Sequence, residues 1–214
     1  MGTPLSKVYN KFLGQIDDKE FLLIDEDILE DLMLDYLDSS ISDFFQCKVD
    51  LSFTPPKRCE VSQQIQGQSS QIEFTPEEGE ITSIKVENMI TNEVYEENVH
   101  YSFIRDLTLD NKVKIVFLGE EDSYFKVTYT LEGYFKNELR PIEIKILALG
   151  MLLAYLKPKI MTQDSLKQFV SDKDFSKLSG ANMLLRLINL KKNIEKELDV
   201  LQSKYSFEDF KGWN

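Results

Sequence analysis

The triplet Glu143-Ile144-Lys145 is the part of this 214-residue chain whose residue types come nearest to a catalytic pattern. With Asp122 upstream, it loosely matches the acidic-x-Lys arrangement by which some nucleases hold Mg²⁺ and position a water molecule. That chemistry needs the Glu and Lys side chains on a strand, where alternate residues point the same way. Pro141 and the apolar residues after it predict a first helical turn instead. A Mg²⁺-dependent nuclease centred on Glu143 and Lys145 therefore remains an alternative hypothesis.

The single histidine and the two cysteines leave few other catalytic options. A Ser-His-Asp triad would depend on His100, and the sequence has no Gly-x-Ser-x-Gly motif to supply the nucleophile. We interpret His100 as a structural residue at the end of a strand. Cys47 and Cys59 form no CxxC pair, and two thiols with one imidazole cannot complete a zinc site. We expect two free cysteines, at least one of them buried.

Carboxylates gather at residues 25–27 and 30–31, where they could in principle bind Ca²⁺ or Mg²⁺. The segment has helical periodicity and lacks the mid-loop glycine of an EF-hand, so we interpret it as a solvated helix face. The nine glycines are scattered, with no P-loop or GxGxxG motif. We therefore expect no catalytic residue, no metal site and no cofactor.

Apolar periodicity predicts helices in the N-terminal part of the chain. Pro4 to Ile16 reads as a short helix, and a second helix of about six turns begins near Asp25. Its expected apolar stripe recurs at spacings of three and four. The stripe consists of Ile28, Leu29, Leu32, Met33, Tyr36, Leu37, Ile41, Phe44 and Phe45.

The middle of the chain changes to a pattern typical of strands. Residues 51–71, with two adjacent prolines and a Gln/Ser-rich run, read as a linker or loop. From Ile72 to Gly133 the sequence alternates in short runs, which predicts a small antiparallel sheet of about four or five strands. A single sheet of this size needs a helix or a neighbouring subunit on its apolar face.

Helical periodicity returns after residue 137. We expect a buried helix from Pro141 to Leu156 that stops before Pro158, and a separate helix over Thr162–Val170. A last helix, from about residue 179 to 205, carries a heptad-like stripe. The stripe consists of Leu184, Leu187, Ile194, Leu198, Leu201 and Tyr205, with Lys191 as the polar interruption.

Together these patterns predict an α+β fold, with a mainly helical body and an inserted small antiparallel sheet. The expected division is an N-terminal helical segment over 1–50, a linker over 51–71, a β insertion over 72–136, and C-terminal helices with a tail over 137–214. Segments 1–50 and 137–214 are expected to pack together as one helical domain.

The charge is strongly acidic and unevenly distributed. The chain has 37 acidic and 25 basic side chains, a formal net charge of −12, which disfavours nucleic-acid binding through the overall field. Residues 1–138 carry a net −16 and residues 139–214 a net +4. This asymmetry suits head-to-tail contact between copies, or contact of the basic helices with an acidic neighbour. Residues 1–6 lack the pattern of a secretory signal, so we expect a protein of the reducing cytoplasm.

Two blocks of the sequence resemble the head-to-tail connector proteins, also called neck or adaptor proteins, of tailed bacteriophages. The first block covers residues 25–51, and its matching elements run from Leu29 through Tyr36-Leu37, Phe44 and Cys47 to Asp50-Leu51. The second block covers residues 138–207. Its matching elements are Leu149-Gly150-Met151, Tyr155-Leu156-x-Pro158-x-Ile160, residues 171–175, Ser179-x-Ala181-Asn182-x-Leu184 and Tyr205-x-Phe207.

The resemblance implies a non-enzymatic structural protein of the virion, located at the head–tail junction and assembled in the cytoplasm of the bacterial host. About twelve copies would form a homo-oligomeric ring that closes on itself. The ring would dock beneath the portal protein and contact adjacent neck and tail proteins. DNA would pass through its bore without sequence-specific binding, and no membrane would be involved.

For interfaces, we expect helix-packing positions at Leu184, Ile194, Leu198 and Leu201, and partner contacts at Phe210 and Trp213. A third reading remains open beside the connector and the nuclease. It is a non-enzymatic assembly chaperone or binding module that leaves before the particle matures.

Overall fold

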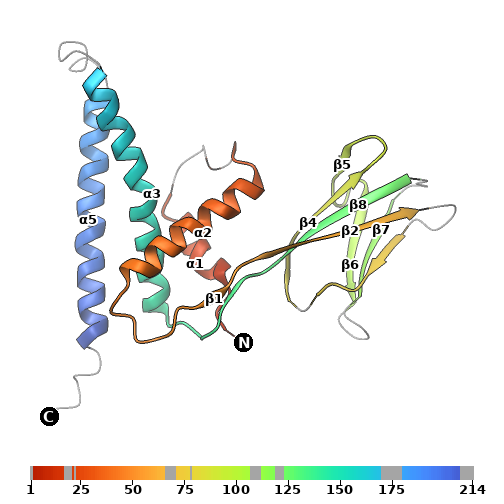
Figure 1. Cartoon of the computed structure of the whole chain (residues 1–214), viewed down its shortest axis with the longest axis horizontal. Helices are drawn as coiled ribbons and strands as arrows, with labels where there is room; N and C mark the ends of the chain where they lie inside the picture. The colour runs from red at the N-terminus through yellow and green to blue at the C-terminus, as the bar shows by residue number, and fades with distance from the viewer. Residues whose placement is uncertain are drawn as a thin grey trace. The chain divides into compact units, whose positions relative to one another are not determined.

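The computed structural model describes residues 2–16, 21, 23–65, 71–77, 79–106, 112–118, 123–169 and 180–207. The chain divides into two compact units. The helical unit contains the chain up to Thr54 and from Tyr134 onward, and the β unit is Pro55–Gly133 (Figure 1). The β unit is therefore an insertion in the helical unit, entered and left at neighbouring points, because β1 (Phe53–Thr54) pairs with β9 (Tyr134–Phe135) just outside it.

The N-terminal helices form where periodicity predicted them. Helix α1 spans Leu5–Leu13 and α2 spans Glu26–Asp43. Met33 and Leu37 of α2 are buried in the core of the helical unit, as expected. Two members of the predicted stripe are not: Ile28 is 62% exposed and Phe45 is 81% exposed. Ile28 lies on the side of α2 that is turned away from α3, and Phe45 follows the end of the helix, so the predicted stripe was both too wide and too long.

Helix α3 (Pro141–Phe169) is the central helix of this unit and packs against α1, α2 and α5. Its run from Ile146 to Leu156 is buried almost throughout, as predicted. The prediction that the helix ends before Pro158, with a separate helix over Thr162–Val170, was wrong, because α3 continues through Phe169. Proline removes one backbone donor, at a cost of about 3 kcal/mol. Leu156 and Ile160, on either side of Pro158, both pack on the core, and their burial offsets that cost.

Helix α5 (Gly180–Phe207) packs against α3, close to the predicted range of 179–205. Ile194, Leu198 and Tyr205 of the heptad-like stripe are buried in the shared core. Lys191, the polar member of the stripe, pairs with Glu195 at 3.2 Å. No helix in the described ranges is long and apolar enough to span a bilayer.

The β unit contains more strands than the sequence predicted. The strands form two sheets with antiparallel neighbours, ordered β2-β8-β4-β5 and β3-β7-β6. Their bounds are Lys57–Ile65 (β2), Gln71–Phe74 (β3), Ile81–Asn88 (β4), Glu93–Tyr95 (β5), Tyr101–Asp106 (β6), Lys112–Phe117 (β7) and Ser123–Leu131 (β8).

The linker predicted over 51–71 was wrong, because this range contains β1 and the nine-residue β2. Strand β2 lies at a sheet edge and pairs with β8 along its whole length, from Lys57 opposite Leu131 to Ile65 opposite Ser123. Most of its side chains are exposed or half-exposed, which is why its composition resembles a loop.

The two sheets cover each other, so the expected need for a helix or subunit on the apolar face was also wrong. One buried cluster takes side chains from both sheets. Phe117 of β7 stacks on Phe125 of β8 with 4.4 Å between ring centroids, and Phe74 of β3 lies 5.1 Å from Tyr129 of β8. The α+β class is confirmed, with a β unit that has its own core instead of one small sheet.

Candidate functional site

Among the described residues of the helical unit, Glu143 is the charged group that is buried, with a side chain that is 0% exposed. It lies in the first turn of α3, as the sequence predicted. The backbone N–H of Arg140 donates to its Oε2 at 2.6 Å, and Nε of Arg140 donates to its Oε1 at 3.1 Å. The carboxylate thus reaches back to a free donor at the helix N-terminus, as the glutamate of a capping box does. A structural role accounts for these contacts.

Tyr205, in the last turns of α5, completes the surroundings of Glu143. Its hydroxyl donates to Oε1 of Glu143 at 2.9 Å and accepts from the backbone N–H of Lys48 at 3.1 Å. The hydroxyl also lies 3.8 Å from Sγ of Cys47. The guanidinium of Arg140 lies 4.9 Å from the centroid of the Tyr205 ring. We call Glu143, Tyr205, Arg140, Lys48 and Cys47 the Glu143–Tyr205 cluster.

Burial is the main cause that raises the pKa of Tyr205, to about 12. The hydrogen bond from Lys48 N–H stabilises the phenolate and opposes this shift, whereas the bond to the Glu143 carboxylate adds to it. At neutral pH the phenol therefore keeps its proton and remains the donor to Glu143.

Lys145 does not share these surroundings. Its ammonium group pairs with Glu197 of α5 at 2.7 Å, and both side chains are about half exposed. Glu143 and Lys145 thus have separate partners, and Asp122 lies outside the described residues. The geometry gives the nuclease hypothesis no support. No group of three His, Cys, Asp or Glu side chains in the described part of the chain is arranged to bind a metal ion.

His100 and the two cysteines share no contact among the described residues. His100 immediately precedes β6, and its Nδ1 accepts from the backbone N–H of Glu96 at 3.0 Å, which confirms its position at the end of a strand. Both cysteines are free. The expectation that at least one is buried was wrong, because Cys47 lies in the loop after α2 and Cys59 on the edge strand β2, and both are half-buried.

The predicted helix-packing positions are used within the chain. Leu184, Ile194 and Leu198 are buried, and Leu201 packs partly buried against the core of the helical unit. The helix that α5 packs against is α3 of the same chain. Phe210 and Trp213, predicted as partner contacts, lie outside the described residues.

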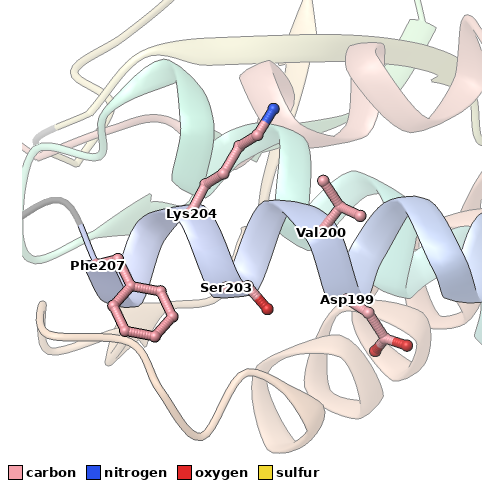
Figure 2. Close-up of a pocket in the computed structure, with 5 residues that line it drawn as sticks. All are labelled: Asp199, Val200, Ser203, Lys204 and Phe207. Carbon is pink, nitrogen blue, oxygen red and sulfur yellow. The ribbon is translucent and has the colours of Figure 1, made fainter.

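The opposite face of α5 was not identified from the sequence. It has a shallow hollow of about 380 Å³ lined by five residues of the helix. Figure 2 shows them in order along the last turns: Asp199, Val200, Ser203, Lys204 and Phe207. Val200 is 52% exposed and Phe207 is 66% exposed. In the sequence, Val200 and Phe207 are seven residues apart, which places both apolar side chains on the same outward face of a helix. This spacing is the signal that could have identified the face.

Comparison of the chain with protein-family models, with curated proteins and with solved structures finds no match. What the structure defines is a class of architecture, a helical unit that carries an inserted two-sheet β unit.

Proposed function

We propose that this protein is a structural subunit of the neck of a tailed bacteriophage. In this proposal about twelve copies form a ring that docks beneath the portal protein, contacts the adjacent neck and tail proteins, and surrounds part of the DNA channel. The subunit performs no catalysis.

The observation that carries the proposal is that the two blocks with the connector pattern, 25–51 and 138–207, fold into one unit. An aromatic contact and a hydrogen bond join the two blocks. The ring of Tyr36 lies 6.2 Å from that of Tyr155, and the hydroxyl of Ser40 donates to the carbonyl of Leu147 at 2.8 Å. Described residues of the two blocks, such as Tyr36 and Tyr155, are thus neighbours, although the whole β unit separates them in the sequence.

Gly150, in the Leu149-Gly150-Met151 element of the resemblance, has a defined role in this packing. A Cβ atom at Gly150 would lie only 2.9 Å from Cβ of Ser40, a separation that real Cβ atoms do not show. Glycine therefore permits α3 to approach α2 closely. This supports the view that the pattern encodes a particular helix crossing.

The charge of the chain is compatible with a DNA channel. Twelve copies at −12 each would carry about −144, so the overall field of the ring would repel phosphate. DNA could then slide through the bore without being held. Retention of DNA by the isolated protein at low salt would contradict this part of the proposal.

The location of the protein in the phage particle tests the proposal. Virions of the phage that encodes this chain are purified and labelled with gold-conjugated antibody against it, after mild disruption of the neck. We expect label at the head–tail junction. Absence of the protein from purified virions would contradict the proposal and favour the assembly chaperone, and label confined to the tail tip would contradict it as well.

A further inference from the structure

We propose that the outward face of α5 binds the outward face of α2 in a second copy of this chain. The inference deepens the proposed function and rests on it, because repetition of this contact would build the ring. The two faces are defined by their exposed charged and apolar residues. The α5 face consists of Arg186, Lys192, Lys196, Val200, Lys204 and Phe207, and the α2 face of Ile28, Asp31, Asp35 and Asp38.

The α2 face is acidic. Helix α2 has seven acidic side chains and no basic one. Asp31, Asp35 and Asp38 are exposed and follow one another at spacings of four and three, so they form one stripe along the helix. Ile28, 62% exposed, continues the stripe at its N-terminal end. None of the three aspartates forms an ion pair with any residue that the structure describes.

The α5 face is basic. Arg186, Lys192, Lys196 and Lys204 are exposed, and no ion pair engages them in the described part of the chain. The neighbouring acids Glu195 and Glu197 are already paired, with Lys191 and Lys145. Asp199, at the border of the hollow, is a further exposed acid beside these four cations, so the face keeps a net positive charge that the aspartates of α2 could complement.

The fold leaves both of these faces exposed. Both α2 and α5 pack against α3, and buried residues such as Met33 of α2 and Ile194 of α5 lie in the core of this unit, on the side of each helix opposite to these faces. Within one copy, no ion pair joins the basic and acidic faces among the residues that the structure describes. The faces can meet between copies in a head-to-tail contact. A row of copies joined in this way keeps one free α5 face at one end and one free α2 face at the other. Such a contact either closes into a ring or continues as a filament.

The apolar residues on the α5 face favour a protein partner over nucleic acid. Val200 and Phe207 border the hollow of about 380 Å³, next to Lys204 (Figure 2). A phosphate backbone would pair with the lysines but leave these side chains in water. The α2 face offers both features at once, since it adds the exposed side chain of Ile28 to its carboxylates.

Charge reversal tests the contact directly. In one variant Lys192→Glu and Lys196→Glu make the α5 face acidic, and in the other Asp31→Lys and Asp35→Lys make the α2 face basic. Each variant alone brings like charges together, whereas an equal mixture restores one attractive contact at every junction, in alternating order. Multi-angle light scattering and native mass spectrometry at low salt give the assembled mass.

We expect wild-type protein to form assemblies of about twelve 24.9 kDa chains and each variant alone to remain monomeric, with an affinity for self-association at least tenfold weaker. The mixture should recover the assembled mass. As the control, Lys7→Glu with Lys11→Glu changes the same charge on two exposed lysines of α1 and should assemble like wild type.

Three results would overturn this inference: a wild-type protein that stays monomeric at low salt, variants that assemble like wild type, or a mixture that fails to assemble. None of these results removes the protein from the virion, so its presence in purified particles tests the proposed function separately. Capture of the wild-type protein by double-stranded DNA, lost with Lys192→Glu and Lys196→Glu, would assign the α5 face to nucleic acid and also overturn the inference.

Discussion

The hydroxyl of Tyr205 donates a 2.9 Å hydrogen bond to Oε1 of Glu143, and both residues are 0% exposed. The bond joins the end of α5 to the start of α3 across 62 positions of sequence. Because the same hydroxyl accepts from the N–H of Lys48, it also fixes the loop after α2. Three segments of the helical unit thus meet at one phenol group.

Replacement of Tyr205 by phenylalanine should lower the free energy of unfolding by about 2 to 3 kcal/mol. The variant removes a donor to a buried carboxylate and leaves the N–H of Lys48 without its acceptor. Chemical denaturation measures the loss. The control is Tyr124→Phe, at a side chain that is 40% exposed, where the change should stay within about 0.5 kcal/mol. Equal effects of the two substitutions would contradict the role assigned to the cluster.

The stability of the helical unit should fall at alkaline pH. The pKa of Tyr205 rises from 10.0 to about 12 on folding, chiefly through burial. The stabilisation is therefore complete below pH 10 and is lost as the pH rises toward about 12, because the unfolded chain releases this proton more readily. Burial also raises the pKa of Tyr36, Tyr101 and Tyr129, so phenolate absorbance should show several late-titrating tyrosines, with one fewer in Tyr205→Phe. If the absorbance lost in Tyr205→Phe belonged to the part of the curve near pH 10, this assignment would be refuted.

A charge in the heptad-like stripe should destabilise the protein. Leu198 is buried between α5 and the core, and Leu198→Asp should cost about 3 kcal/mol or more, since the carboxylate would have no partner. Leu190→Asp is the matched control on the same helix, at a leucine that is 45% exposed. Thermal unfolding of both variants measures the difference. Unchanged stability in Leu198→Asp would show that this stripe does not stabilise the helical unit.

The crossing of α2 and α3 should depend on Gly150. We expect Gly150→Ala to cost about 1 to 2 kcal/mol, because overpacking against Ser40 outweighs the gain in helix propensity. The cost should be smaller in a Ser40→Ala background, because this substitution removes the hydroxyl oxygen of Ser40, the atom nearest to a Cβ at position 150. A double-mutant cycle by urea denaturation measures this coupling. Strictly additive effects would show that the two residues are not in contact.

The two cores should respond separately to mutation. Phe125 is 0% exposed in the β unit, so Phe125→Ala should cost about 3 to 5 kcal/mol of that unit's stability. Hydrogen exchange should become faster in β4, β7 and β8 and remain unchanged in α3 and α5. Tyr124→Ala, at the preceding and more exposed position, is the control. Equal acceleration in α3 would mean that the two units unfold as one.

Local periodicity correctly predicted the helices whose buried face is marked by the spacing of their own apolar residues. The stripe through Ile194 and Leu198 and the buried run from Ile146 to Leu156 are of this kind, because one apolar face needs one covering partner. Strand β2 was missed because its pairing with β8 is non-local: Cys59 lies opposite Tyr129. An edge strand with exposed polar side chains has no apolar alternation to detect.

Tertiary packing explains the other differences between the structure and what the sequence predicted. Pro158 is a strong local signal for a helix end, but the core contacts of Leu156 and Ile160 override it. The position of Glu143 in a first helical turn was predictable, whereas its bond to Tyr205 was not, since nothing in either local pattern points to the other. The charge asymmetry and its place on separate helices were visible in the sequence, but only the fold shows that both helices pack on α3.

The copy number of the protein in purified virions tests whether the chain forms a ring in the neck. Quantitative mass spectrometry with isotope-labelled peptides of this chain gives copies per particle, relative to a structural protein of known number. We expect about twelve copies in each particle, as the proposed closed ring requires. A virion preparation that contains no copy of the chain would contradict the proposal.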